Sequence, residues 1–183
     1  MKAHKLLTGA FFVLICHVFF AFAQQSRKPD VVYVPTNEKI VDAMLELAKV
    51  TKEDTVYDLG CGDGRIVITA AKEFGASGIG IEINPELVKL AGENARQAGV
   101  AERVKFIEAD LFKTDFRLAS VVMLYLSPGV NLRLRPRLLK QLKPGTRIVS
   151  HDFHMGDWKP EQTVKLEAAT LYFWTVPAKK PKP

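Results

Sequence analysis

Apolar and polar positions follow two different rhythms along this chain, and the change from one to the other recurs. Short apolar, β-branched runs typical of buried strands lie at residues 56–59, 79–81, 104–107, 121–126 and 147–150. Apolar positions at helical spacing lie between them, at residues 65–74, 85–98 and 131–142. Strands that alternate with helices in this way predict a parallel sheet covered by helices on both faces.

Less regular patterns flank this alternating region. Residues 30–35 predict a short extended segment, after which Thr36 is expected to cap a helix with apolar positions Ile40, Val41, Met44, Leu47 and Ala48. Residues 164–166 and 171–176 resemble strands and predict a closing antiparallel pair. We therefore expect one α/β domain over residues 24–176.

The N-terminal residues 1–23 have the three parts of a secretory signal. Two lysines form a basic start, an apolar run covers residues 6–23, and Ala21-Phe22-Ala23 gives the small-x-small pattern that is cut before Gln24. We expect a signal peptide and an exported protein, periplasmic or secreted. The run is also long enough to span a bilayer, so the alternative is a membrane anchor with the domain facing the cytosol.

Composition and charge narrow the picture once the two ends are set apart. With 183 residues, 48% of them hydrophobic, the chain is neither disordered nor fibrous. Its formal charge of +6 suggests a polyanionic partner. Two of those charges lie on Lys2 and Lys5, however, and three on residues 177–183, a Lys/Pro tail expected to be disordered. The domain itself is almost neutral, and we expect no nucleic-acid partner.

The turn after the first predicted strand carries the strongest chemical signal. Gly60, Gly62 and Gly64 alternate there, where a tight turn needs positive φ and a ligand must approach the backbone closely. In a dinucleotide site the third glycine would stand at the position of Arg65. Asp58, just before the turn, would repel a pyrophosphate and suits a cation. This combination favours S-adenosylmethionine, which carries a sulfonium and an amino group and no phosphate.

Two further acids follow the next two predicted strands. Glu82 is placed to accept hydrogen bonds from ribose hydroxyls, and Asp110 to accept one from an adenine amino group. Leu111 or Phe112 would then pack on the adenine ring. Three acids at the ends of three successive strands, with the glycine turn after the first, are improbable as ordinary loop caps. A binding site for a nicotinamide dinucleotide is about as improbable as that interpretation.

These residues carry a family resemblance. The chain resembles class I methyltransferases, in particular the archaeal broad-specificity protein lysine methyltransferases, and is more distantly similar to the mitochondrial ATP synthase c-subunit lysine methyltransferases. The resemblance rests on Tyr33-Val-Pro-Thr36, on the block from Val56 to Ile66 and on Val149-Ser-His-Asp-Phe153 followed by Trp158 and Pro160. It implies a Rossmann-like, seven-stranded, mostly parallel sheet whose last strand is reversed.

The resemblance also implies that Tyr33 and Thr36 contact the methionine end of the cofactor. Together with the turn and the acids, this gives one predicted set of residues that bind S-adenosylmethionine: Tyr33, Thr36, Asp58, Gly60, Cys61, Gly62, Gly64, Arg65, Glu82, Asn84, Asp110 and Leu111. Cys61 is the lone cysteine after residue 23, so we expect no disulfide within the mature chain.

The methyl acceptor is expected at the end of the fourth predicted strand, next to Tyr125. The chain lacks the Asn/Asp-Pro-Pro-aromatic motif that holds planar nitrogens there, which argues against DNA bases and glutamine amides. Tyr125 and Tyr33, with Phe153 and Trp158, could instead form an aromatic channel around a lysine, although the last two could equally be core residues.

His151 and Asp152 are candidates to take or relay the amine proton. No further ligand cluster supports a metal site at residues 151–154, so we expect no metal. The preferred function is methyl transfer to lysines of proteins by a monomeric, minimal methyltransferase domain. The alternatives are a small-molecule or lipid-amine methyltransferase and a cofactor-binding module without turnover.

Overall fold

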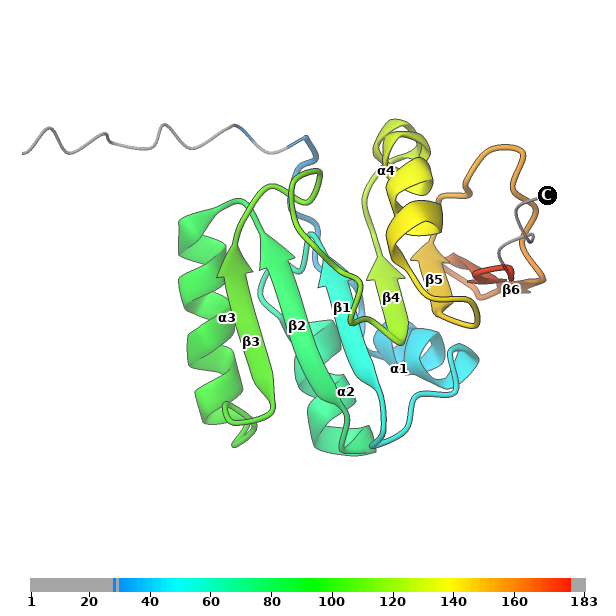
Figure 1. Ribbon diagram of the computed structural model, residues 1–183. Helices are drawn as coiled ribbons and strands as arrows, with labels where there is room; N and C mark the ends of the chain where they lie inside the picture. Colours follow the sequence, from blue (N-terminus) through cyan, green and yellow to red (C-terminus); the bar gives the residue numbers. More distant parts are fainter. Residues whose placement is uncertain (1–27, 29, 179–183) are drawn as a thin grey trace, which may run out of the picture.

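Seven strands form one twisted sheet, with four helices packed against it (Figure 1). The computed structural model describes residue 28 and residues 30–178. The helices are α1 (Glu38–Leu47), α2 (Arg65–Phe74), α3 (Pro85–Gln97) and α4 (Pro128–Gln141). The strands are β1 (Thr55–Leu59), β2 (Ser77–Glu82), β3 (Val104–Glu108), β4 (Val121–Leu124), β5 (Arg147–His151), β6 (Gln162–Lys165) and β7 (Thr170–Thr175).

The strand order is β3-β2-β1-β4-β5-β7-β6, and the first five of these strands are parallel. Strand β7 runs antiparallel to β5 and to β6. The mostly parallel sheet with a reversed last strand, predicted from the sequence, is confirmed. The order reverses at β1, between β2 and β4, and the crevice at the carboxyl ends of such strands is where open α/β sheets bind ligands.

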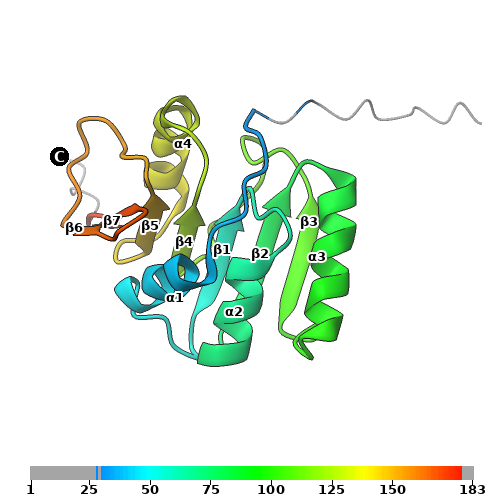
Figure 2. The same cartoon turned by 180° about the vertical axis from the view of Figure 1, so that it is seen from behind.

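Alternate residues of the central strands feed two separate cores. Val56 and Met123 face the core beneath α1 and α2, whereas Tyr57 and Leu124 face the core beneath α4. Helix α3 continues the first layer, so α1, α2 and α3 cover one face and α4 the other (Figure 2). The expected cover on both faces is therefore present, and it leaves the carboxyl edge of the sheet open to form a site.

Several predicted boundaries shift by one to three residues, and local hydrogen bonds explain two of the shifts. Asn37, not Thr36, caps α1, because its side chain accepts from the Lys39 amide. Helix α4 begins at Pro128, three residues earlier than expected, because Ser127 caps it. The early start ends β4 at Leu124 and leaves Tyr125 in the connection above the sheet.

The predicted signal peptide (residues 1–23) and most of the predicted tail (residues 179–183) lie outside the described residues. Within residue 28 and residues 30–178, none of the helices combines the length and the apolar character that crossing a membrane requires.

Asp54 joins three elements at the amino edge of the sheet. Its buried carboxylate accepts from the Thr51 amide at 2.8 Å and the Ser120 hydroxyl at 2.7 Å, and it pairs with Arg147 at the start of β5. Burial raises the pKa of Asp54, but the hydrogen bonds from Ser120 and Thr51 and the charge of Arg147 hold it below its ordinary value. The ionised form is therefore the one that stabilises the fold.

We predict that Asp54→Ala lowers the free energy of unfolding by about 3–5 kcal/mol, because it leaves the Arg147 guanidinium without its partner. The stabilisation should be present at neutral pH and be lost as the pH falls through the depressed pKa of Asp54. Urea unfolding at neutral and acidic pH measures both effects. The exposed Asp42→Ala on α1 is the matched control, with an expected change within about 0.5 kcal/mol. Equal stability of the two variants would contradict the role of Asp54.

Candidate active site

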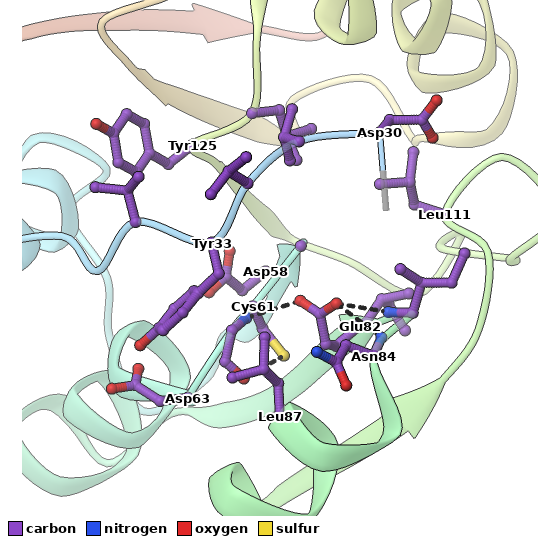
Figure 3. A pocket seen from close by; sticks show the side chains of 18 of the residues that line it. Asp30, Tyr33, Asp58, Cys61, Asp63, Glu82, Asn84, Leu87, Leu111 and Tyr125 are labelled. Carbon is purple, nitrogen blue, oxygen red and sulfur yellow. Dashed lines mark hydrogen bonds between the residues drawn. The ribbon is translucent and has the colours of Figure 1, made fainter. Parts of the chain in front are cut away.

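A cavity of about 410 Å³ lies at the carboxyl ends of β1, β2 and β4, beneath the extended segment that leads into α1 (Figure 3). Its size is typical of a small-molecule site. Eleven of the twelve predicted cofactor residues line it: Tyr33, Thr36, Asp58, Gly60, Cys61, Gly62, Arg65, Glu82, Asn84, Asp110 and Leu111. Residues separated by up to 78 positions in the sequence, Tyr33 and Leu111, thus meet in one cavity.

The glycine turn is fitted to its neighbours as well as to a ligand. Gly62 has φ +53°, and a Cβ there would lie 2.3 Å from the Tyr33 ring, so this ring packs directly on the bare backbone. Gly64, the one predicted cofactor residue that does not line the cavity, has φ +82° and lies against Phe106 and Ala91. Its bare backbone lets the turn pack closely on β3 and α3.

Glu82 holds the turn in place. One of its carboxylate oxygens accepts from the Gly62 amide at 3.1 Å, and the other accepts from the amides of Ile83 at 2.8 Å and Asn84 at 3.0 Å. The sequence predicted ribose hydroxyls as its partners, which stays a prediction. What the structure adds is that the same carboxylate joins the glycine turn to the start of α3. Figure 3 shows these bonds as dashed lines.

Asp58 lies almost completely buried beside the turn, with its carboxyl on the cavity. Burial first, and then the negative charges of Glu82 and Asp63, raise its pKa from 3.8 to about 8. In the ligand-free protein Asp58 is therefore mostly protonated at neutral pH. A cation bound next to it would favour the carboxylate.

Asp110 and Leu111 line the other end of the cavity, after β3. Asp110 accepts from the Phe112 amide at 2.9 Å. The Phe112 ring does not line the cavity. It lies under the guanidinium of Arg133 on α4, whose central carbon is 4.1 Å from the centroid of the Phe112 ring. Leu111, rather than Phe112, is thus the apolar side chain available to a bound adenine.

The extended segment of residues 30–36, called the strap below, is fixed at both ends. At one end Arg65 donates to Asp63 through two nitrogens and to the Thr36 carbonyl at 2.7 Å. Burial and the neighbouring Asp63 carboxylate raise the pKa of Tyr33, whose ring points toward Asp63 in Figure 3. At the other end Asp30 pairs with Arg133 at 3.2 Å.

The predicted acceptor residues are only partly brought together. Tyr125 lines the cavity, and behind it the buried His151 ring is stacked at 3.8 Å between centroids. The Phe153 ring lies 6.2 Å from that of Tyr125, nearly parallel to it. Trp158, however, packs against Trp174 at 5.9 Å and is not among the residues that line the cavity. Phe153 does not line the cavity either, so the aromatic wall, as the term is used below, is the Tyr125 ring with His151 and Phe153 behind it, without Trp158.

His151 and Asp152 lie behind this wall. Burial lowers the pKa of His151 although the Asp152 carboxylate is 3.4 Å from its Nε2, and neither ring nitrogen has a hydrogen-bond partner among the described residues. Asp152 has φ +60° and accepts from the Thr170 amide at 2.8 Å. His154 is exposed.

Sequence reasoning missed Asn131, which the structure shows fully buried on α4. Its amide nitrogen donates to the Ser150 hydroxyl at 3.1 Å and to the Phe153 carbonyl at 3.0 Å, so it holds the turn that carries the wall. A polar residue within an otherwise apolar helix face was the signal that could have revealed it.

The cavity fits S-adenosylmethionine in its donor and acceptor groups. Five acids line it, Asp30, Asp58, Asp63, Glu82 and Asp110, and the ionised ones among them would repel the phosphates of a dinucleotide. Across the described residues, no group of three or more His, Cys, Asp or Glu side chains converges as it would around a metal ion.

Comparison with known proteins decides between the remaining cofactor classes. The ANTKMT methyltransferase domain matches residues 58–162. The chain is also 46% identical to a protein-lysine N-methyltransferase of Saccharolobus islandicus, over 82% of this chain and 97% of that protein. The chain belongs to the ANTKMT methyltransferase family. It is thus an S-adenosylmethionine-dependent methyltransferase, as the glycine turn and the acids predicted.

Two other similarities bear on the acceptor. The ATP synthase c-subunit lysine N-methyltransferase of Mus musculus is 33% identical over 84% of this chain, which covers only 62% of that protein. A crystal structure from Salinibacter ruber, described as an RNA methyltransferase in complex with S-adenosyl-L-homocysteine, is 57% identical. The match covers 82% of this chain and 98% of the Salinibacter chain, with a TM-score of 0.79.

We predict that cofactor binding by this methyltransferase depends on pH through Asp58. Because its pKa is about 8 in the ligand-free protein and a cationic ligand lowers it, binding below pH 8 releases a proton, and the dissociation constant falls as the pH rises from about 6 to about 8. Calorimetry with S-adenosylmethionine in two buffers of different ionisation enthalpy measures the released proton. Asp58→Asn should bind more weakly and without this dependence. If the affinity of the unaltered protein for S-adenosylmethionine does not change with pH, the predicted role of Asp58 is wrong.

Proposed function

We propose that this methyltransferase transfers methyl groups to the lysine side chains of proteins. The observation that carries the proposal is the aromatic wall at the acceptor end, where Tyr125 is backed by the stacked ring of His151 and flanked by Phe153. Flat rings of this kind pack along the aliphatic stem of a lysine side chain. The relative from Saccharolobus islandicus and its name support the same acceptor class.

A lysine amine must be neutral to accept a methyl group, and its ordinary pKa of about 10.4 leaves few neutral amines at pH 7. Bound S-adenosylmethionine supplies the methyl group on a sulfonium. The half-buried, apolar face of Tyr125 disfavours the charged form of the lysine and so favours loss of its proton. Aligning the neutral amine with the methyl group then contributes most of the rate enhancement.

Neutral His151 is suited to this step in two respects. Burial keeps its pKa below the ordinary value, so at neutral pH the ring behind Tyr125 adds no positive charge that would oppose a lysine ammonium. An uncharged imidazole is also able to accept a proton, and its two ring nitrogens are not engaged by described residues. We propose His151 as the group that takes or relays the proton, with Asp152 as the nearest charge.

The RNA methyltransferase description of the Salinibacter ruber structure makes RNA the second candidate acceptor. The distribution of positive charge near the cavity argues against RNA as the acceptor. Of the two cations that line the cavity, Lys28 and Arg65, Arg65 is engaged by Asp63, and Arg133, which anchors the strap, is engaged by Asp30. Phosphate binding needs cations that are free to replace counterions.

Labelling with radioactive methyl from S-adenosylmethionine tests the proposal. With mixed proteins and RNA in one reaction, we expect label on lysine in the protein fraction. Tyr125→Ala should lower turnover about 100-fold through misalignment of the amine, with cofactor affinity nearly unchanged. The matched control Tyr125→Phe, which keeps the ring, should retain most of the rate. Label in RNA, or on no lysine of any protein, would reject lysine as the acceptor.

We further propose that residues 1–23 act as an export signal, and that the mature protein is a monomer. The basic start, apolar run and Ala-Phe-Ala pattern support the signal. N-terminal sequencing of the native protein after cell fractionation should find a chain that begins at Gln24 outside the cytosol. A chain that retains Met1 in the membrane fraction would instead favour the anchor. Export would also require a supply of S-adenosylmethionine in that compartment.

A further inference from the structure

We propose that the acceptor protein docks by adding an extended strand to the free backbone edge of the strap, at residues 31–34. This proposal rests on the proposed lysine acceptor and specifies the form in which the lysine is presented. The partner is a stretch of protein that is able to become extended, with its lysine side chain directed toward Tyr125.

The backbone of the strap is unpaired. Val31 lies at a bend and residues 32–34 belong to no helix or strand, and within the described part of the chain the N–H and C=O groups of residues 31–34 make no hydrogen bond. Such a row of free donors and acceptors is a template for another strand. Strand addition to an exposed edge is a recurring mode of peptide recognition.

The side chains of residues 32–34 are exposed, Tyr33 included at 41%, and only Val31 is half-buried. Val31 is half-buried against the core beneath α4, and the Tyr33 ring lies on Gly62. Val32 and Val34, between and after them, are 87% and 55% exposed. Both valines line the cavity, and most of the side-chain surface of each is left open to a partner. A docked strand would cover them, and the run Val-Val-Tyr-Val has the composition that favours strand pairing.

The strap is also held in place before any partner arrives. Arg65 fixes the Thr36 carbonyl at one end, and Arg133 fixes Asp30 at the other. Figure 2 shows the segment leading from the carboxyl edge of the sheet down to α1. A backbone already anchored at both ends loses less conformational freedom when a strand pairs with it.

The position of the strap connects docking to chemistry. Residues 31–34 and Tyr125 line the same cavity, so a strand on the strap would run along the entrance to the acceptor end. Main-chain hydrogen bonds do not depend on the sequence of the partner. Docking of this kind would therefore accept lysines in many sequence contexts, provided that the surrounding segment is able to extend.

Backbone-methylated peptides test this docking mode with the unaltered enzyme. The substrate is a short N-acetylated peptide with one central lysine between threonines and valines. Two variants carry N-methyl groups on backbone nitrogens, one at the residues directly beside the lysine and the other at the residues next but one. In a paired strand the N–H groups of alternate residues point to the same edge, so only one variant loses the groups that face the strap.

We expect one variant to lose about tenfold or more in kcat/KM and the other to stay within about twofold of the unmodified peptide. Cofactor affinity, measured by calorimetry, should be the same with all three. If both variants react like the unmodified peptide, or both fail equally, strand addition is wrong and the lysine acceptor stands. If no lysine is methylated in this peptide or in any protein, the proposed function fails, and the docking proposal with it.

A protein variant gives an independent check. Replacing both exposed valines, as Val32→Ser with Val34→Ser, should lower kcat/KM for the unmodified peptide several-fold. Because these valines also line the cavity, any loss that acts through the cofactor should appear equally with a single capped lysine, which is too short to form a strand, so the loss with the peptide should be several-fold larger than the loss with capped lysine. Equal losses with the peptide and with capped lysine would contradict docking on the strap.

Discussion

The carboxylate of Glu82 is the point on which the site depends. It lies at the end of β2, and its two oxygens accept from three amides in two separate segments, the glycine turn and the start of α3. A turn with three alternate glycines has little conformational preference of its own, so something must select one conformation. Glu82 does so, and the cost of burying its charge is offset by hydrogen bonds that a neutral side chain could not replace. The glycine turn then supports the Tyr33 ring, and through it the strap.

The buried carboxylate of Glu82 also adds to the negative charge around the cavity. Glu82 and Asp63 both carry charge near Asp58, and burial adds to their effect, so the ligand-free protein keeps Asp58 protonated. Burial and the neighbouring acids also raise the pKa of the Cys61 thiol far above its usual range, which leaves this cysteine unreactive in the turn. A cationic ligand reverses the balance at Asp58. The cavity is therefore selective by charge before any shape is considered, and it disfavours the phosphate-bearing cofactors that use the same fold.

Much of this could be predicted from the sequence because the signals are local. Strand, glycine turn and helix follow one another within residues 55–74, and each acid lies within two residues of the end of its strand, so register alone brings the three acids to one edge. What escaped prediction depends on residues far apart. Asp30 and Arg133 are 103 positions apart, and nothing in either neighbourhood indicates the other. Trp158 could not be assigned because an aromatic residue in a loop suits a core and a site equally well, and its partner Trp174 lies on the reversed strand.

The two ends of the cavity differ in how they are enclosed, and this difference has a consequence for function. The cofactor end is fixed by charge and backbone on every side, from Glu82 below to the anchored strap above. At the acceptor end the Tyr125 ring is backed by the His151 ring and followed by apolar Leu126, and Asn131 holds the turn at Phe153 behind them. Hydrogen-bonding groups discriminate between ligands far more strongly than apolar walls do. An enzyme built in this way is exacting toward its methyl donor and permissive toward its acceptor, so any selection among acceptors has to come from the surface around the entrance, where the strap lies.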